Sequence, residues 1–306
     1  MRILVFGAGV IGSVYAGHLL RAGHEVTMLA RGRRLADLTE SGLVLDNAES
    51  GQREVLPVTV VDTPRPDGRY ELVLVAVRAE QLSATLPLLT GMPGGPDVLF
   101  FGNTAGRSAQ MRDALGQRAL FGFPAAGGVR DGPAIRYVLI SAQQTMLGEA
   151  TATASDRVQQ LRRVLQRAGF PTTISSNIDG WLLGHAAFIV PIAFALYRFD
   201  ADPARLAADR QALRTMVRAT RQAFRALSGT AEIPANLRAL YRLPTPAAMG
   251  YWRRVMAGHR GELWFAAHCR AAPAEMHSMA AELQATIRST GQPTPDLDTL
   301  LTAPAT

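Results

Sequence analysis

Three glycines near the start of the chain have the spacing of a phosphate-binding turn. Gly7, Gly9 and Gly12 form the pattern G-x-G-x-x-G, and Val10 and Ile11 stand between the last two. In such a turn the first glycine permits a tight bend and the second lets the backbone approach a pyrophosphate. The third lets a helix pack closely on a strand. These five residues are therefore predicted to bind a dinucleotide.

The residues around this turn have the pattern of a strand, a helix and a second strand. The apolar run Arg2–Phe6 predicts a buried strand, and residues 13–21 predict an amphipathic helix. Glu25–Leu29 predicts the second strand. The free N–H groups and positive dipole end of such a helix attract phosphate. This context favours dinucleotide binding over a chance glycine-rich turn.

A basic group follows the second predicted strand. NAD enzymes place a carboxylate there for the ribose 2′-hydroxyl, but this chain has Arg31, with Arg33 and Arg34 beside it and no carboxylate before Asp37. The planar guanidinium suits a 2′-phosphate because it pairs with phosphate oxygens and is always charged. NADP(H) is therefore favoured over NAD(H). The alternative is a solvated basic loop.

Two more polar residues stand at predicted strand ends. Arg78 follows the β-branched run at residues 70–77, and Asn103 follows the run Asp97–Phe101. Strands alternate with helices through this part of the chain, a pattern typical of a doubly wound, Rossmann-type α/β sheet. Ligands bind at the carboxyl ends of the strands in such sheets, so Arg78 and Asn103 are candidates for cofactor binding and for catalysis.

The alternation then gives way to other patterns. Residues 54–61 predict one outer strand, and the segment from residue 119 to 149 predicts two antiparallel strands that close the sheet. Beyond residue 177 no further strand–helix–strand unit appears and helical patterns dominate. We therefore expect a nucleotide-binding Rossmann domain over residues 1–176 and an all-helical domain for substrate and dimerisation over residues 177–306.

Composition narrows the class of protein. The formal charge is +7 and all 32 basic residues are arginine, scattered without the interleaved aromatic residues of a nucleic-acid groove, so no nucleic-acid partner is expected. Cys269 is the only cysteine, which predicts no metal cluster and a reducing cytoplasm. The most apolar run, residues 186–197, is shorter than the roughly 20 residues of a membrane span and predicts a buried helix.

A stripe of arginines recurs every three or four residues along one predicted helix. Neighbouring positions 213, 216, 217, 223 and 224 are apolar. Such a stripe could bind an acidic partner or a membrane surface. The commoner explanation is a solvated outer face on a helix packed against the core, which we expect here. The stripe consists of Arg210, Arg214, Arg218, Arg221 and Arg225.

Taken in order, these features resemble the ketopantoate reductase (2-dehydropantoate 2-reductase) family over nearly the whole chain. The resemblance rests on the glycine turn, Arg31, the VAVRAEQ segment, Asn103, the GGVRDG segment, Trp181 and the GQPTPDLDTL segment. It implies an NADPH-binding Rossmann domain followed by an all-helical domain. It also implies a homodimer by analogy.

The substrate half departs from that family. Its proton-donating lysine falls on Leu183, the asparagine one turn later falls on Ala187, and the substrate-contacting serine falls on Leu263. A second active-site lysine falls on Arg78. The resemblance implies that the catalytic glutamate is Glu275.

A ketone that accepts hydride becomes an alkoxide and needs a positioned proton or a stabilising charge. The acid–base candidates are Glu275 and His185, with His268 and His277 as weaker ones. Arg78 and Asn103 would orient the substrate, since the pKa of an arginine is too high for ordinary proton transfer.

We therefore expect a cytoplasmic NADP(H)-dependent oxidoreductase that moves hydride to or from a small, rather apolar carbonyl or alcohol. Two alternatives remain open at this point. One is a non-redox enzyme on the same fold, and the other is a catalytically silent NADP-binding sensor.

Overall fold

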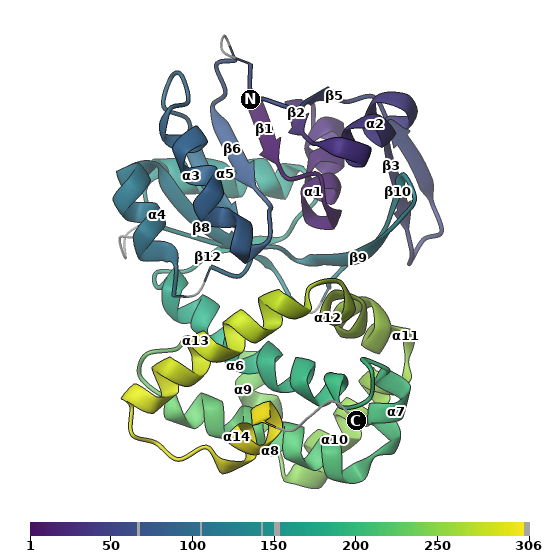
Figure 1. Ribbon diagram of the computed structural model, residues 1–306, viewed down its shortest axis with the longest axis vertical. Coiled ribbons are helices and arrows are strands. Elements are labelled where there is room, and N and C mark those ends of the chain that lie inside the picture. Colours follow the sequence, from purple (N-terminus) through teal and green to yellow (C-terminus); the bar gives the residue numbers. More distant parts are fainter. Residues whose placement is uncertain (66–67, 105, 142, 150–153, 303–306) are drawn as a thin grey trace. The chain divides into compact units, whose positions relative to one another are not determined.

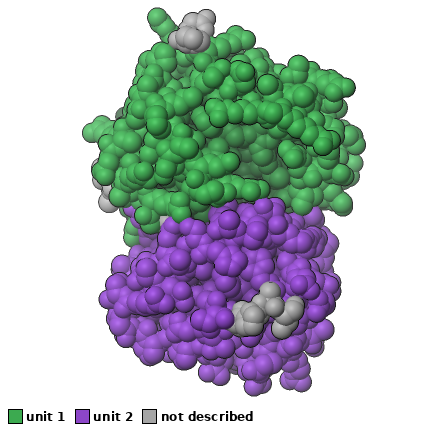
Figure 2. Space-filling model, in the orientation of Figure 1, with its two compact units in different colours: residues 1–178 green, residues 179–306 purple. Residues whose placement is uncertain are grey.

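In the computed structural model the chain forms two compact units, Met1–Ile178 and Asp179–Thr306 (Figure 2). The structure describes residues 1–65, 68–104, 106–141, 143–149 and 154–302.

The first unit is built on an eight-stranded sheet in the order β12-β11-β8-β7-β6-β1-β2-β5 (Figure 1). All neighbouring strands are parallel except β8 and β11, so the predicted Rossmann-type α/β class is confirmed. The strands are β1 (Arg2–Phe6), β2 (Glu25–Leu29), β5 (Thr59–Val61), β6 (Leu72–Val75), β7 (Asp97–Phe101), β8 (Ala119–Phe123), β11 (Thr145–Gly148) and β12 (Thr172–Ile174). The helices are α1 (Val10–Arg21), α2 (Gly32–Ser41), η1 (Ala79–Gln81), α3 (Leu82–Thr90), α4 (Ser108–Leu115), η2 (Gly116–Arg118) and α5 (Asp156–Arg167).

A second sheet, which the sequence did not predict, has four strands in the order β4-β3-β10-β9. They are β3 (Leu43–Asn47), β4 (Arg53–Leu56), β9 (Ala126–Asp131) and β10 (Ala134–Leu139). Residues 54–61 were expected to form one strand, but they supply β4 to this sheet and β5 to the large one. Pro57 lies between the two and has no N–H group to continue a ladder. The prediction of two antiparallel strands that close the large sheet is correct for β8 and β11, which pair antiparallel there. It is wrong for the segment between them, because β9 and β10 belong to the second sheet.

The second sheet packs on α1 through one small residue. A Cβ atom at Gly17 would overlap the Cδ1 methyl group of Leu45 and lie 3.1 Å from Leu56 Cδ1, so a larger residue would require these leucine side chains to move. Leu43, Leu45 and Ile135 are buried in the same core as Val14 of α1. Helix α1 is thus covered by the second sheet as well as by the large one.

The second unit is helical, as expected. Its helices are α6 (Ile178–Tyr197), α7 (Pro203–Ala208), α8 (Arg210–Ala226), α9 (Ala235–Arg242), α10 (Thr245–Ala257), α11 (His259–Gly261), the π-helical turn η3 (Glu262–Ala266), α12 (Ala267–Ala271), α13 (Pro273–Ser289) and α14 (Pro295–Thr302). The prediction that residues 186–197 are too short to span a membrane was wrong about length. Helix α6 starts at Ile178 and has 20 residues, most of them apolar, which is enough by length and composition. Since 83% of its most apolar window is buried inside the protein, it is a core helix, as predicted.

Helix α8 presents the arginine stripe to solvent. Its apolar residues Leu213, Val217 and Phe224 are buried in the helical core. Arg210 and Arg214 are exposed. The expected solvated outer face is confirmed for the amino-terminal half of the helix.

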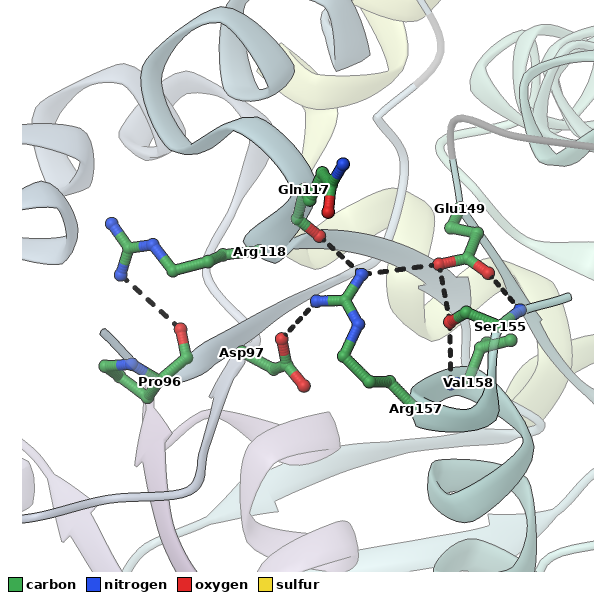
Figure 3. Close-up of polar contacts among 8 residues, drawn as sticks. All are labelled: Pro96, Asp97, Gln117, Arg118, Glu149, Ser155, Arg157 and Val158. Carbon is green, nitrogen blue, oxygen red and sulfur yellow. Dashed lines mark hydrogen bonds and ion pairs between the residues drawn. The ribbon is translucent and has the colours of Figure 1, made fainter. Parts of the chain in front are cut away.

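A polar network fastens α5 to the amino-terminal edge of the large sheet (Figure 3). The Arg157 guanidinium donates to Asp97 Oδ1 at 2.5 Å and to the Gln117 carbonyl at 2.7 Å, and it lies 3.5 Å from Glu149 Oε2. Glu149 is buried and also accepts from the Ser155 N–H and hydroxyl groups, at 2.5 and 3.0 Å. Ser155 is the N-cap of α5, so one arginine neutralises the carboxylate that holds the start of the helix.

Replacing Arg157 tests this network. We expect Arg157→Met to lower the free energy of unfolding by about 2 kcal/mol, because it leaves the buried Glu149 carboxylate without its cation while Arg157 itself is partly exposed. Chemical denaturation measures the change. Arg163→Met, at an exposed position of the same helix, is the matched control and should change stability by less than about 0.5 kcal/mol. Equal losses in both variants would contradict the assignment.

Candidate functional site

The residues predicted to bind the cofactor lie at one edge of the large sheet. Strand β1 is central, and Phe6, its last residue, is in register with Leu29 at the end of β2 and with Val75 at the end of β6. From β1 the chain continues outward to β2, whereas from β6 it continues outward in the opposite direction to β7. The switch point where ligands bind in such sheets therefore lies between β1 and β6.

The glycine turn follows β1 directly. Gly7 has φ +113°, and a Cβ atom there would lie 2.5 Å from the Ala76 carbonyl oxygen. A Cβ at Gly12 would overlap the Gly7 carbonyl oxygen. A Cβ at Gly9, in contrast, would meet no atom within 4 Å. Gly7 and Gly12 are thus required by close packing, whereas the exposed Gly9 borders open space that a phosphate group can enter.

The amino terminus of α1 is arranged for an anion. Gly9 is the N-cap and offers no side chain, and the first turn, which begins with the half-buried Val10 and Ile11, contains no acidic residue. The N–H groups of a helix start carry partial positive charge and need acceptors. The pyrophosphate of a dinucleotide supplies such acceptors, so this strand–turn–helix fits the predicted cofactor.

Arg34 braces the same turn, a role that the sequence analysis missed. The side chain is buried, and it donates from Nε to the Ala8 carbonyl at 3.0 Å and from Nη2 to Ser13 Oγ at 3.1 Å. Its Nη1 donates to the Pro133 carbonyl at 2.7 Å, in the loop between β9 and β10. Burial lowers the Arg34 pKa, and nearby Arg130 lowers it further. One guanidinium therefore links the glycine turn, α1 and the second sheet.

Arg31 differs from Arg34 in position. It is the N-cap of α2, directly beyond β2, and its side chain is exposed. Asp62 lies just beyond the neighbouring β5. The Thr63 hydroxyl is the main cause that lowers the Asp62 pKa, and the charge of Arg31 contributes. Arg33, also exposed, lies 4.0 Å from Asp37. Of these three arginines, Arg31 stands at the end of β2 with its guanidinium open to a ligand.

Arg78 and Asn103 also lie at the carboxyl edge, beyond β6 and β7. Arg78 is exposed and precedes η1, where its backbone N–H donates to Gln81 Oε1 at 3.4 Å. Asn103 is half-buried. The hydroxyl of the next residue, Thr104, is buried and has no hydrogen-bond partner among the described residues. The fold therefore brings Arg78 and Asn103 to the same edge as the glycine turn and Arg31.

His185 belongs to the second unit and lies on α6. Its ring stacks on Trp181 with centroids 5.7 Å apart and planes at 9°, and it meets the edge of Phe188. Burial, and secondarily the charge of His268, lowers the His185 pKa to about 3. The imidazole is therefore neutral near pH 7, so His185 is poorly suited to deliver a proton there.

Glu275 lies in the first turn of α13 and is buried. Its charge is one cause that raises the Tyr197 pKa, after burial and Cys269. The Tyr197 hydroxyl donates to the Cys269 carbonyl at 3.0 Å, and its ring stacks on His277. Tyr197 is twelve residues beyond His185, about 18 Å along the helix axis. Tyr197, the residue on α6 whose pKa Glu275 affects, thus lies well away from His185 on the same helix.

Three positions at which the resemblance implies polar residues carry apolar side chains, and these side chains are buried or half-buried. Ala187 is buried, and Leu183 is partly buried against the same helical core. Leu263 is half-buried and lies in the π-helical turn η3. Within the described residues, no group of three or more histidine, cysteine, aspartate or glutamate side chains could hold a metal ion.

Comparisons with known proteins agree with this geometry. The sequence model of the family described as Ketopantoate reductase PanE/ApbA matches residues 3–152. This match, over just under half of the chain, supports a ketopantoate reductase-like family member. The 2-dehydropantoate 2-reductase of Pyrococcus horikoshii is 25% identical over 181 residues, which cover 59% of this chain and 58% of that protein. The match thus spans less than two thirds of the relative's length.

Solved structures share the complete fold. A putative ketopantoate reductase from Ralstonia solanacearum is 21% identical with a TM-score of 0.75, over 98% of this chain and 95% of that one. A D-mandelate dehydrogenase solved with NADH and anilino(oxo)acetate is 16% identical with a TM-score of 0.77, over 98% and 96%. At these identities the likeness shows the fold: a Rossmann-like domain followed by a helical region.

Removing Arg34 tests its role in holding the turn. We expect Arg34→Met to lower the free energy of unfolding by about 3 kcal/mol, because buried carbonyl groups lose a charged donor. Affinity for the nicotinamide cofactor should fall about tenfold as the glycine turn loosens. Denaturant titration and calorimetry measure the two effects. Arg33→Met, the exposed neighbour, serves as the control, and a similar effect there would show that only net charge matters.

The His185 pKa predicts how stability depends on pH. The folded-state pKa of about 3 is below the unfolded value near 6.5, so the unfolded chain binds the proton more readily. The contribution of the neutral His185 ring to the free energy of unfolding is therefore complete above pH 6.5 and is lost as pH falls toward 3.

We expect His185→Gln to lose less stability than the wild type between pH 7 and 4, measured by thermal melts across that range. The exposed His259→Gln controls for removing a histidine. A wild-type pH dependence in His185→Gln would contradict the assigned burial.

Proposed function

We propose that the protein is an NADP(H)-dependent oxidoreductase acting on a small, rather apolar carbonyl or alcohol. The observation that carries this proposal is the open space at Gly9, at the uncapped start of α1 and on the same sheet edge as the exposed Arg31. Membership of a family whose relatives are named 2-dehydropantoate 2-reductase supports a nicotinamide cofactor and redox chemistry.

Each group at the sheet edge has a defined role in this proposal. The N–H groups at the start of α1 bind the pyrophosphate, and Arg31 pairs with the 2′-phosphate. The bound cofactor supplies hydride at nicotinamide C4. Arg78 and Asn103 orient the carbonyl, and Arg78 stabilises negative charge on its oxygen as the carbon accepts hydride.

Glu275 is the proposed proton donor to that oxygen. It is preferred over His185 because the His185 ring is neutral near pH 7. Leu183 and Leu263 favour a less polar substrate than a hydroxy acid, since neither can hydrogen-bond to one. Cytoplasmic location and homodimer formation through the helical unit belong to the same proposal.

One experiment tests the reaction. The purified protein is mixed with NADPH and a panel of ketones and aldehydes that differ in apolar bulk, and the reduced-nicotinamide absorbance band is followed. We expect turnover with apolar carbonyls and little with ketopantoate. Tight NADPH binding with no turnover of any carbonyl would instead favour a catalytically silent NADP-binding protein, consistent with a leucine where the family has its lysine.

Cofactor choice depends on Arg31. We expect the wild type to prefer NADPH to NADH, and Arg31→Ala to weaken NADPH binding about 10- to 100-fold, since a charged hydrogen bond contributes about 1.5–3 kcal/mol. NADH affinity should change less than twofold. Titration of both cofactors measures this, with Arg33→Ala as control. Equal affinity for the two cofactors, unchanged in Arg31→Ala, would exclude the assignment.

The proton donor is tested separately. Glu275→Gln should lower kcat by about 10²–10⁴-fold and remove the alkaline limb of the pH–rate profile, because a proton donor stops acting once it is deprotonated, while leaving NADPH affinity unchanged. Glu282→Gln, two turns further along α13, is the matched control. Wild-type turnover in Glu275→Gln would remove Glu275 from the mechanism.

A further inference from the structure

The helical unit contains a basic cavity, separate from every residue discussed for the reaction. Its volume is about 550 Å³, within the range of small-molecule pockets. The cavity lies where the carboxyl-terminal half of α8 meets the loop before α9 and α9 itself. None of its ten lining residues is acidic, and four are arginines: Arg221, Arg225, Arg238 and Arg242.

One of these arginines has a structural role. Arg221 donates from Nε to the Tyr241 carbonyl at 2.9 Å and from Nη1 to Thr245 Oγ1 at 2.6 Å, and Nη2 donates to the Leu243 carbonyl. It thus binds the carbonyl groups at the carboxyl terminus of α9. No carboxylate is among these partners, so its positive charge remains at the wall of the cavity.

The other three arginines keep donors for a ligand. Arg238 uses Nη2 to bind the Ile233 carbonyl at 3.0 Å. For Arg225 and Arg242, both exposed, the described part of the chain shows no hydrogen bond or ion pair from the guanidinium. Two carbonyls in the last turn of α8, those of Ala223 and Arg225, accept from the N–H groups of Leu227 and Ser228 and so do not need an arginine donor.

Nothing nearby in the sequence cancels this charge. Glu232 is the only carboxylate between residues 221 and 242, and it does not line the cavity. Elsewhere on α8, Arg218 has a carboxylate partner, Asp296, at 3.0 Å. The basic cavity therefore differs from the rest of the stripe in two ways, since it is concave and no acidic residue is among its lining residues.

The floor of the cavity is apolar. Phe224 and Tyr241 pack edge to face with ring centroids 5.3 Å apart, and Ala231 and Ile233 complete the lining beside them. Arginine side chains pair with phosphate oxygens through two N–H groups at once. An apolar floor beneath several such groups suits an organic molecule with phosphate at one end.

We propose that this basic cavity binds a small organic phosphate that carries at least two negative charges. An acidic protein or a membrane would contact the whole arginine stripe, including the exposed Arg210 and Arg214, which lie outside the cavity. The concave shape and the apolar floor favour a small molecule. This proposal is independent of the proposed reaction.

The test compares two charge-matched double variants of the full-length protein. Inorganic pyrophosphate is titrated by calorimetry into the wild type, Arg225→Gln/Arg242→Gln and Arg210→Gln/Arg214→Gln. We expect the cavity variant to lose affinity at least tenfold and the stripe variant to change less than twofold. Any binding at the glycine turn is common to all three proteins and cancels in the comparison.

A second probe tests the apolar floor, because phenyl phosphate should bind several-fold more tightly than inorganic phosphate. No binding of pyrophosphate by the wild type, or equal losses in both double variants, would overturn the proposal. Equal losses would point to a diffuse basic surface for a macromolecule. If the cavity variant is poorly folded, Arg225→Lys/Arg242→Lys keeps the charge and removes the paired donors, and it should still lose affinity.

Discussion

The nucleotide site depends on the contact between two backbone segments, at Gly7 and Gly12. Because Gly12 has no Cβ, helix α1 begins directly against the turn that ends β1. This contact aims the start of α1 at the switch point between β1 and β6. Gly17, five residues further along, lies against leucine side chains of the second sheet instead of against backbone. Gly12 thus fixes where the glycine turn meets the helix, and Gly17 leaves room for the leucines of the second sheet.

The chain contains no lysine, and arginine side chains link its loops, helices and sheets. Arg34, Arg157 and Arg221 each bind at least one backbone carbonyl and a second group from another segment. A guanidinium has five donors in a fixed plane and can span several acceptors, whereas an ammonium group is a single point. The use of arginine in place of lysine therefore changes how loops are held without changing the net charge.

The parts of the fold that arise from local pattern were predictable. The β1–α1–β2 unit follows from residues within 30 positions of one another, and the glycine spacing places its ligand edge. The second sheet was not predictable, because β3 pairs with β10 about 90 residues away and no local signal announces that pairing. Pro57 marks the break between β4 and β5, a signal that was present but was not used.

The candidate site shows the same division. Arg31 and Arg34 look alike in the sequence, but Arg34 shares a helix face with the buried Leu38, four residues later. That spacing was a sequence signal for an inward side chain. The neutral state of His185 could not be foreseen, since it depends on rings packed around it in the folded unit.

The second sheet also bears on how tightly a ligand can bind. Helix α1 lies between two sheets, and Arg34 ties the turn at its start to the loop between β9 and β10. A turn that is already ordered loses little conformational entropy when a ligand arrives. The free energy of the new phosphate contacts can then appear as affinity instead of being spent on ordering the chain.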